Sequence, residues 1–388
     1  MASVVGFDAV VVGAGPAGGM AARELAAAGF RTALVDKKKV VGIPVQCAEG
    51  VGRFALESNG LRARPEWALQ EVRGARCYVP SGDAFVITRL PGYALDRGAF
   101  DRWIAEDAAA LGAVLRTDTR VEGIERHDGG WRLRTSRGEI DAPIVIAADG
   151  PTSQIARWLG MLERRDAGVA YEYRFDARDV DTPDPERFLL FTAERYHGGY
   201  AWIFPRGDAF NVGVGGHLDA HAATVAFCHD QGIDPARARA KIAGQIPYHY
   251  EFSRYAGNGV AVAGDAAGVT NPMDGGGIHA ALWSGRVAGA IAVEALGAEE
   301  PGRLDAYDRV LRESPFLDPV FWWAIERIRT WPDRMLNFIG RALRDRTHRE
   351  VGNLEKFLGV LREPATLPHA YALHRLHRAM DLCEYYAW

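Results

Sequence analysis

The stretch Gly13 to Gly18 reads Gly-Ala-Gly-Pro-Ala-Gly, which is a G-x-G-x-x-G pattern. A short β-branched run, Phe7–Val12, precedes it and predicts a buried strand. The Ala-rich stretch Met20–Ala28 predicts a helix, and the apolar run Thr32–Val35 predicts a second strand that ends at Asp36. This strand–loop–helix–strand order is a βαβ unit, and a glycine-rich loop inside such a unit indicates a dinucleotide-binding fold.

The residues of this unit each have an expected task. Gly13 permits the tight turn, Gly15 lets the backbone approach a pyrophosphate, and Gly18 lets the helix pack closely on the strand. The helix N-terminus at Ala17 offers N–H groups to the phosphates, and Asp36 can accept hydrogen bonds from the adenosine ribose. The alternative is a glycine-rich turn in a plain βαβ unit, but the surrounding pattern favours the dinucleotide.

Two later segments indicate FAD rather than a nicotinamide dinucleotide. Ala147–Gly150 reads Ala-Ala-Asp-Gly at a predicted strand end, and Ala263–Ala267, which contains Asp265, follows another. The glycine-rich stretch Pro272–Gly277 then leads into a predicted helix over Ile278–Leu296. A strand-end acid can hold a ribityl chain, and a helix N-terminus can stabilise negative charge on a reduced flavin. An extended FAD needs such segments from distant parts of the chain.

Composition narrows the function classes. The 388 residues are 48% hydrophobic and 25% charged, which is typical of a globular protein, and the net charge of −4 argues against nucleic-acid binding. No C-x-x-C pair occurs, so we expect no zinc site, no iron–sulfur cluster and no other metal site. No apolar run approaches about 20 residues, and we expect no signal peptide. Isolated cysteines indicate a reducing compartment, so we expect a cytoplasmic protein.

Periodicity predicts the remaining elements. They are a helix over Phe100–Leu111 and strands over Val121–Arg126, Trp131–Thr135, Ile140–Ala147 and Val260–Ala263. The strands between 121 and 147 predict a small meander that returns into the main sheet. Residues 165–255 predict a mostly antiparallel sheet, and the chain beyond Leu304 predicts helices.

Two further segments carry a family resemblance. Gly42–Val51 reads G-I-P-V-Q-C-A-E-G-V, and Gly198–Pro205 reads G-G-Y-A-W-I-F-P. They resemble the G-x-P-x-x-C-G-E-G and Y-x-W-x-F-P segments of the geranylgeranyl reductase family, which includes archaeal digeranylgeranylglycerophospholipid reductases. Ala48 stands where that family usually has Gly. Because Gly permits a positive φ or a close flavin approach, Ala48 is expected to alter the shape of the loop.

The resemblance implies an α/β fold of the aromatic-hydroxylase-like branch of flavoproteins. A glutathione-reductase-type FAD-binding Rossmann domain would carry an inserted, mostly antiparallel β-sheet substrate domain and a C-terminal helical region. The expected boundaries are 1–75, 95–160 and 255–300 for the FAD-binding domain, 76–94 and 161–254 for the substrate (catalytic) domain, and 301–388 for the helices.

The fingerprint and the resemblance together give a set of expected site residues. The expected FAD contacts are Gly13, Gly15, Ala17, Gly18, Asp36, Cys47, Ala48, Gly50, Arg97, Val121, Asp265, Gly275, Gly277 and Ile278. The residues expected to line a prenyl cavity are Tyr200, Trp202, Phe204 and Pro205. The catalytic candidates are Cys47, Tyr200 and Trp202, whereas Cys77, Cys228 and Cys383 are expected to be structural.

The implied reaction is the saturation of isolated C=C bonds in a polyprenyl (geranylgeranyl) lipid or its diphosphate precursor. No carbonyl polarises such an alkene, so one carbon must take a proton while flavin N5 delivers hydride to the more substituted carbon. Aromatic faces stabilise the positive charge that develops. Alternation puts Tyr200, Trp202 and Phe204 on one strand face, a pattern also typical of ordinary sheet core.

Cys47 has three candidate roles: weak acid, shape filler or redox partner. An unperturbed thiol has a pKa of about 8.5, and burial in an apolar tunnel makes it a still weaker acid. We therefore favour the interpretation that Cys47 shapes the tunnel.

Several alternatives stay open at this stage. A flavin-dependent monooxygenase or halogenase of the same fold is one, because halogenases carry a similar W-x-W-x-I-P segment. A non-catalytic flavin-bearing lipid carrier or electron-transfer protein is another. No second G-x-G-x-x-G is present, so the electron donor would be NAD(P)H bound without its own Rossmann unit, or a ferredoxin-like protein. The aromatic and Arg-rich tail, which contains Phe321–Trp323 and Arg327, predicts either a peripheral membrane contact or a helical cap over the lipid cavity.

Overall fold

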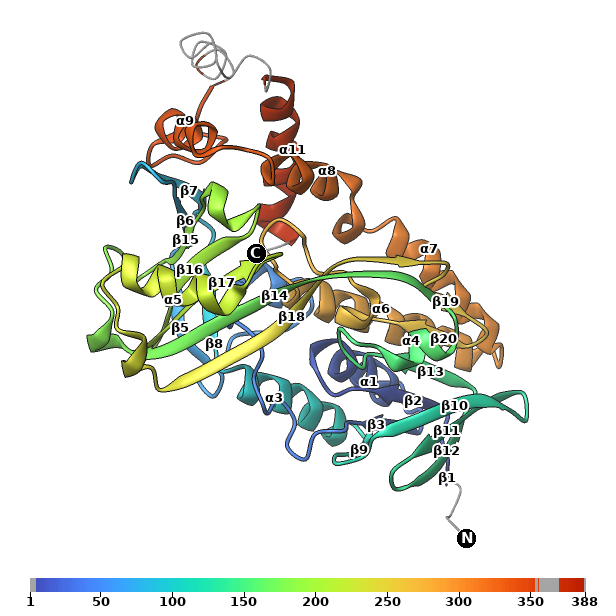
Figure 1. The fold of residues 1–388 in the computed structure, drawn as a ribbon. Helices are drawn as coiled ribbons and strands as arrows, with labels where there is room; N and C mark the ends of the chain where they lie inside the picture. Colours follow the sequence, from blue (N-terminus) through green and yellow to red (C-terminus); the bar gives the residue numbers. More distant parts are fainter. Residues whose placement is uncertain (1–4, 353–354, 356–369, 387–388) are drawn as a thin grey trace.

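The computed structural model describes residues 5–352, 355 and 370–386. Its central sheet has six strands in the order β19-β20-β13-β2-β3-β9 (Figure 1). Their bounds are β2 Ala9–Val12, β3 Thr32–Val35, β9 Val114–Arg116, β13 Ile144–Ala147, β19 Ala256–Gly257 and β20 Val260–Val262. All neighbours run parallel except β19 and β20. Except for β9, where Val114 is exposed, these strands are buried on both faces and consist almost wholly of Ala, Val, Ile and Leu.

Helices α1 (Pro16–Ala27), α3 (Arg97–Ala110) and α6 (Ile278–Gly297) pack together at this sheet. Small residues allow α1 and α6 to approach closely: a Cβ at Gly285 would lie 2.0 Å from the carbonyl oxygen of Ala17. The predicted dinucleotide loop therefore lies where β2, α1 and α6 meet.

The predicted meander is present, with one correction. The four-stranded sheet has the order β1 (Val5–Gly6), β12 (Gly138–Ala142), β11 (Gly130–Thr135), β10 (Val121–His127). The single strand predicted over Ile140–Ala147 is wrong, because β12 and β13 belong to different sheets and are separated at Pro143. Proline has no N–H to donate to a continuing ladder, so the chain changes sheets there.

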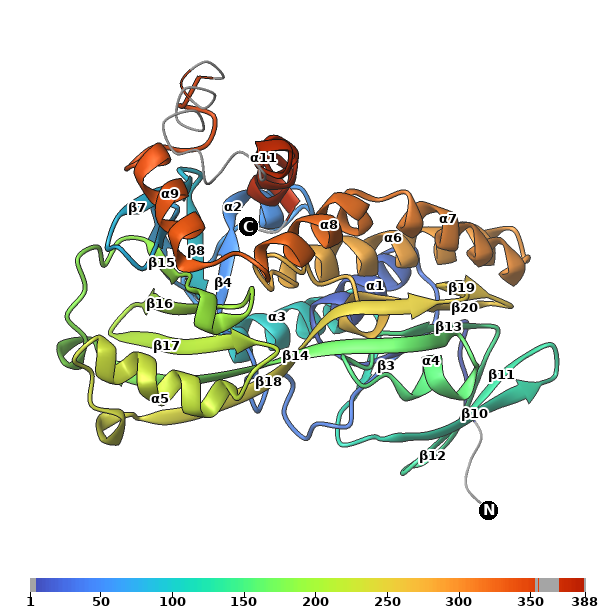
Figure 2. The ribbon, with the colours of Figure 1, turned by 45° about the horizontal axis from the view of Figure 1, so that its top comes forward.

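The second large sheet has seven strands in the order β18-β14-β17-β16-β15-β6-β7. Their bounds are β6 Ala75–Tyr78, β7 Ala84–Thr88, β14 Leu162–Asp176, β15 Phe188–Phe191, β16 Tyr200–Arg206, β17 Ala209–Gly216 and β18 Ala240–Phe252. The long strands β14 and β18 extend from this sheet toward the central one (Figure 2). Helix α5 (Ala220–Asp230) packs against β14 and β17 and was not predicted; Asp219 caps it by accepting a hydrogen bond from Ala222 N.

Smaller elements complete the fold. A three-stranded sheet joins β4 (Gly50–Gly52), β8 (Gly92–Leu95) and β5 (Ala68–Val72), next to α2 (Arg53–Glu57). Helix α4 (Gln154–Trp158) follows β13. The C-terminal helices are α7 (Ala306–Arg312), α8 (Pro319–Ile328), α9 (Asp333–Leu343) and α11 (Ala370–Tyr386).

The C-terminal helices share a hydrophobic core with the seven-stranded sheet. Phe321 of α8 and Leu376 of α11 belong to the same buried cluster as Trp202 and Phe204 of β16. Within the part of the chain that the structure describes, no helix has both the length and the apolar character required to cross a bilayer. Residues 353–354, 356–369 and 387–388 of the predicted helical region lie outside the described residues, and the three-part domain division stays a prediction.

Candidate active site

A large cavity of about 910 Å³ is lined by residues of both large sheets and of the loops between them. One part is lined by the predicted dinucleotide loop, including Gly13, Gly15 and Asp36, and another by Tyr200, Trp202 and Phe204. Its volume lies at the upper end of the range usual for cofactor and ligand sites.

The glycine-rich loop fits a pyrophosphate. Gly13 has φ +101°, and a Cβ there would lie 2.1 Å from the carbonyl oxygen of Ala148. A Cβ at Gly18 would lie 1.7 Å from the carbonyl oxygen of Gly13, so both positions require glycine. At Gly15, by contrast, no atom lies within 4 Å of a Cβ position, and the residue lines the cavity. No side chain caps the N-terminus of α1, so its N–H groups remain available to phosphate oxygens.

Asp36 and Asp265 lie at the ends of two central strands, β3 and β20. The carboxylate of Asp36 accepts hydrogen bonds from Ala14 N and Lys38 N, both at 2.7 Å, which fixes its orientation toward the cavity. Asp265 Oδ1 accepts a hydrogen bond from Thr270 Oγ1 at 3.2 Å, and burial raises the pKa of this carboxyl. Both carboxyl groups keep oxygen lone pairs for the hydroxyl groups of a ribose or ribityl chain.

The N-terminus of α6 forms a further part of the cavity wall. Gly275, Gly277 and Ile278 line the cavity, and no side chain caps the helix at Gly277. The positive end of the helix dipole therefore faces the cavity, as expected for stabilising a reduced flavin.

The structure brings together nearly all the residues predicted for the site. Those that line the cavity are Gly13, Gly15, Ala17, Asp36, Cys47, Ala48, Gly50, Arg97, Val121, Tyr200, Trp202, Phe204, Asp265, Gly275, Gly277 and Ile278. Gly18 and Pro205 do not line it. Gly18 packs α1 onto the Gly13 turn, and Pro205 lies on the opposite face of β16 from Trp202 and Phe204 because side chains alternate along a strand.

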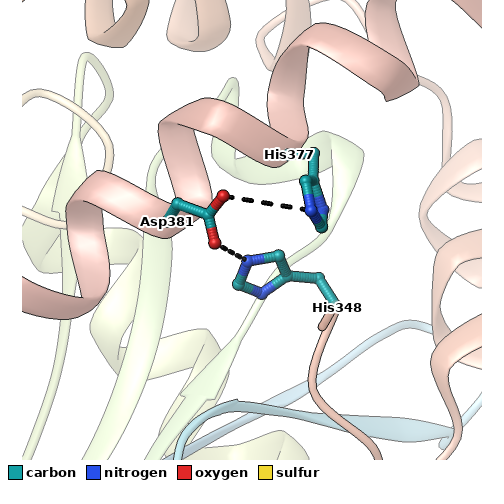
Figure 3. A group of neighbouring side chains, drawn as sticks. All are labelled: His348, His377 and Asp381. Atoms are coloured by element: carbon teal, nitrogen blue, oxygen red, sulfur yellow. Dashed lines mark hydrogen bonds and ion pairs between the residues drawn. The ribbon is translucent and has the colours of Figure 1, made fainter. Parts of the chain in front are cut away.

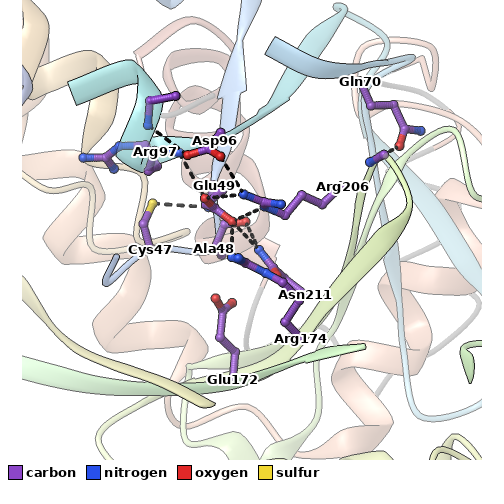
Figure 4. A network of polar contacts seen from close by, with 12 residues as sticks. Cys47, Ala48, Glu49, Gln70, Asp96, Arg97, Glu172, Arg174, Arg206 and Asn211 are labelled. Atoms are coloured by element: carbon purple, nitrogen blue, oxygen red, sulfur yellow. Dashed lines mark hydrogen bonds and ion pairs between the residues drawn. The ribbon is translucent and has the colours of Figure 1, made fainter. Parts of the chain in front are cut away.

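Glu49 lies within the Gly42–Val51 segment, but the sequence alone predicted no role for it. It has φ +70° and a fully buried side chain, and Figure 4 shows it at the centre of a polar network. Its Oε1 accepts a hydrogen bond from Arg97 N at 3.0 Å. Its Oε2 accepts from Arg206 Nε at 2.5 Å and from Asn211 Nδ2 at 3.1 Å, and Arg174 also donates to it. Glu49 thus fixes the Cys47–Glu49 turn against the seven-stranded sheet.

The local backbone explains why Ala48 can stand where the family pattern has Gly. The positive φ in this turn falls on Glu49, not on Ala48, so Ala48 adopts a conformation open to any residue. Asn211 Nδ2 also donates a hydrogen bond to the Ala48 carbonyl at 3.1 Å. The expectation that Ala48 alters the loop through a positive φ is therefore wrong, whereas an effect of its methyl group on a close flavin approach stays a prediction.

Two cysteines line the cavity from different parts of the chain. Cys47 is partly buried, its Sγ accepts a hydrogen bond from Glu49 N at 3.2 Å, and burial raises the pKa of its thiol. Cys383 of α11 was expected to be structural only, but it lines the cavity as well as lying 3.7 Å from the sulfur of Met273. The last helix therefore closes part of the cavity wall.

The aromatic stripe of β16 carries defined polar contacts. Tyr200 donates its hydroxyl hydrogen to the carbonyl oxygen of Asp274, and burial raises the pKa of Tyr200 well above its usual range. Trp202 Nε1 donates to Glu172 Oε2 at 3.0 Å. The ring of Phe204 lies 4.4 Å from that of Phe188, centroid to centroid.

Comparison with known proteins identifies the family of this chain. The model for FAD dependent oxidoreductases matches residues 45–246, and that for the FAD binding domain matches residues 8–80. A digeranylgeranylglycerophospholipid reductase from Methanothrix thermoacetophila is 37% identical over 328 residues, covering 79% of this chain and 83% of the relative. The chain belongs to the digeranylgeranylglycerophospholipid reductase family. A second family member, from Methanothermobacter thermautotrophicus, is 34% identical over 374 residues, and the match covers 91% of this chain and 94% of that relative.

Solved structures agree with this digeranylgeranylglycerophospholipid reductase fold. A geranylgeranyl bacteriochlorophyll reductase-like protein from Thermoplasma acidophilum superposes with a TM-score of 0.83 at 26% identity, covering 98% of this chain and 100% of that one. A flavin-dependent brominase superposes with a TM-score of 0.69 at 16% identity, covering 98% of this chain and 94% of that one, a likeness of fold alone. The chain is a flavin-dependent oxidoreductase, and its cofactor is FAD.

Away from the cavity, the described residues of this digeranylgeranylglycerophospholipid reductase homologue contain one cluster of metal-ligand type. His348, His377 and Asp381 place their ligand atoms within 4.8 Å of one another (Figure 3). Asp381 Oδ1 already accepts His348 Nε2 at 2.9 Å and Arg349 Nε at 2.6 Å. Because an arginine neutralises the only carboxylate of the group, the cluster serves to hold α11 to the segment before it.

Proposed function

We propose that this protein saturates isolated C=C bonds in the geranylgeranyl chains of an isoprenoid lipid, with FAD as the redox cofactor. The digeranylgeranylglycerophospholipid reductases that it resembles are named for a lipid with two such chains. Reduced FAD, when bound, supplies a hydride.

The observation that carries the proposal is the continuity of the cavity. The same space is lined by the dinucleotide loop, by the Cys47–Glu49 turn and by the aromatic stripe of β16. Around the stripe the walls are apolar, with Ile87, Phe188, Leu190 and Ile246 among the lining residues. A prenyl chain placed along the stripe therefore has its double bonds within the same cavity as the cofactor.

The side chains of this region suit the charge that alkene reduction develops. When one alkene carbon takes a proton, positive charge appears on the more substituted carbon. The faces of Tyr200, Trp202 and Phe204 attract such a charge, and each close aromatic contact contributes up to about 2 kcal/mol in a desolvated site. The Trp202 indole donates a hydrogen bond to Glu172, and the Tyr200 hydroxyl donates one to the Asp274 carbonyl. Both rings are therefore fixed before the substrate arrives.

The proposal also covers the electron donor and the contact with the membrane. With one G-x-G-x-x-G in the sequence, electrons would reach FAD from NAD(P)H bound outside a Rossmann unit or from a ferredoxin-like protein. The C-terminal helices would act as a cap over the lipid cavity, since Cys383 lines it, and peripheral membrane contact would be secondary. Flotation with anionic liposomes tests the second point: the cap interpretation expects most of the protein to stay with the unbound fraction.

Mass spectrometry of the lipid product tests the proposed reaction. The FAD-loaded protein is reduced with dithionite under anaerobic conditions and incubated with a digeranylgeranyl glycerophospholipid. The expected product gains two hydrogens per double bond, and the gain does not depend on O₂. A product that forms only with O₂ and gains oxygen or halogen would favour a monooxygenase or halogenase, and an unchanged lipid would favour a carrier.

A further inference from the structure

Glu172 is a buried carboxyl group that holds the Trp202 indole through one of its two oxygens. It lies on β14, is 2% exposed and lines the cavity. Its carboxyl points toward the Cys47–Glu49 turn, as Figure 4 shows. Alternation along β14 puts Tyr171 and Tyr173 on the opposite face, where they pack with the core next to α5. Glu172 therefore lies where the cofactor side of the cavity meets the aromatic stripe.

A specific gap in the sheet lets Trp202 reach this carboxyl. In the strand register, Gly213 of β17 lies between Glu172 of β14 and Trp202 of β16. A Cβ at Gly213 would lie 2.4 Å from Trp202 Cζ2 and 2.6 Å from Glu172 Cβ. Glycine is therefore required there for the indole to lie across β17 and donate to Glu172 Oε2 at 3.0 Å.

The other carboxyl oxygen of Glu172 has no partner among the described residues. Oε1 is buried and accepts no hydrogen bond. An indole N–H is a donor only, so Oε2 must be the accepting oxygen, and in the neutral acid the O–H then belongs on Oε1. An unsatisfied buried carboxylate oxygen is costly, whereas a hydroxyl on Oε1 would be free to donate its hydrogen to a bound ligand, since no described residue accepts it.

The charges around Glu172 also favour its neutral form. The nearby cations Arg174 and Arg206 are both engaged by Glu49, whose negative charge repels a second carboxylate. Cys47, on the turn that faces Glu172, adds no negative charge at neutral pH, because burial raises the pKa of its thiol. On the β18 side the register neighbour is the apolar Ile242. Burial, then repulsion from Glu49, raises the pKa of Glu172 to about 8, so the group is mostly protonated at neutral pH.

We propose that Glu172 is the acid that protonates the alkene, which makes it a catalytic residue of the proposed reaction. Oε1 is covered in this structure, so the carboxyl group turns to present it to the alkene when the lipid binds. The O–H bond at Oε1 then breaks and its electron pair stays on the carboxylate, while the alkene π pair forms the new C–H bond at the less substituted carbon. The more substituted carbon then accepts the hydride that reduced FAD supplies. Trp202 stabilises the carboxylate that remains, and solvent protons restore the acid between turnovers.

Other acids of the cavity are less suited to this step. The hydroxyl of Tyr200 is already donated to the Asp274 carbonyl, and its pKa is raised well above the usual range. Burial raises the pKa of the Cys47 thiol above its ordinary value, so it is the weaker acid. The Asp274 carboxyl, with a pKa of about 6, is mostly ionised at neutral pH, and Gly276 N donates to it at 2.9 Å.

The test compares Glu172→Gln with Glu163→Gln, which makes the same chemical change at an exposed position of β14. Two readouts are used: infrared difference spectra of the carboxyl C=O band across pH, and the anaerobic single-turnover rate at which the lipid reoxidises the dithionite-reduced flavin. Glu172→Gln is expected to keep FAD, lose a protonated carboxyl band that titrates near pH 8, and slow alkene reduction about 100-fold or more. Glu163→Gln is expected to match wild type in both.

The inference rests on the proposed function, but the two can fail separately. If wild type does not reduce the lipid, the proposed function is wrong, and the infrared band still reports whether Glu172 carries a proton. A wild-type rate in Glu172→Gln, or a wild-type spectrum without that band, would overturn the inference. If Glu172→Gln loses FAD, Glu172→Asp decides: a rate that still falls as pH rises, but with a shifted midpoint, supports the acid, and an unshifted midpoint contradicts it.

Discussion

Replacing Glu49 by Gln should destabilise the protein far more than its small change in volume suggests. The substitution removes the one carboxylate that two buried guanidinium groups share, those of Arg174 and Arg206, which are 17% and 13% exposed. Breaking a buried ion pair by removing one partner costs about 3–5 kcal/mol, and the carboxylate that remains near the two groups is that of Asp96, 3.5 Å from Arg206. With an unfolding entropy of about 2.1 cal/mol/K per residue over 388 residues, Tm should fall by about 4–6 °C.

Thermal unfolding followed by circular dichroism, on apo and FAD-loaded protein, measures this effect. Glu186→Gln is the matched control, because Glu186 pairs with Arg73 at 2.9 Å but both side chains are more than half exposed. A surface pair contributes at most about 1 kcal/mol, so the control Tm should stay within about 1 °C of wild type. Because Glu49 fixes the Cys47 turn, Glu49→Gln should also release FAD at a lower temperature. Equal Tm values for the two variants would refute the argument.

Four further predictions concern the cavity. Gly15→Val should fold but lose FAD, because its side chain enters the space assigned to the pyrophosphate; flavin absorbance after gel filtration measures this, and full retention of FAD would contradict it. Cys47→Ala should still reduce alkenes but change which double bonds are saturated, as read by product fragmentation, whereas unchanged products and rate would remove Cys47 from the mechanism. Wild-type alkene reduction should fall as pH rises through about 8, since the acid form of Glu172 is then lost. In Trp202→Phe the midpoint should move to higher pH, because the indole N–H that stabilises the carboxylate is gone, and an unchanged or lower midpoint would count against that role.

The cofactor half of the site was largely predictable from sequence because its signals are local. Gly13, Gly15 and Asp36 lie within one βαβ unit, where spacing alone fixes which residues face the phosphates and the ribose. The strand predicted over Ile140–Ala147 shows the limit of this reasoning: its apolar run is continuous, but Pro143 divides it between two sheets.

The acid–base half of the site was not predictable, because it depends on pairing between distant segments. Glu49 meets Arg174 and Arg206 across 125 and 157 residues, and Glu172 meets Trp202 across β17. Only the strand register shows that Gly213 leaves room for this last contact. Cys383 reaches the cavity for the same kind of reason, since the packing of α11 on α8 and α2 decides its position.

The stoichiometry of anaerobic flavin reoxidation tests the central claim most directly. Dithionite-reduced protein, freed of excess reductant, is mixed with a digeranylgeranyl glycerophospholipid without O₂, while flavin absorbance and lipid mass are followed together. The account predicts that one flavin is reoxidised for each double bond saturated. Flavin that stays reduced until O₂ is admitted, with every double bond intact, would contradict it.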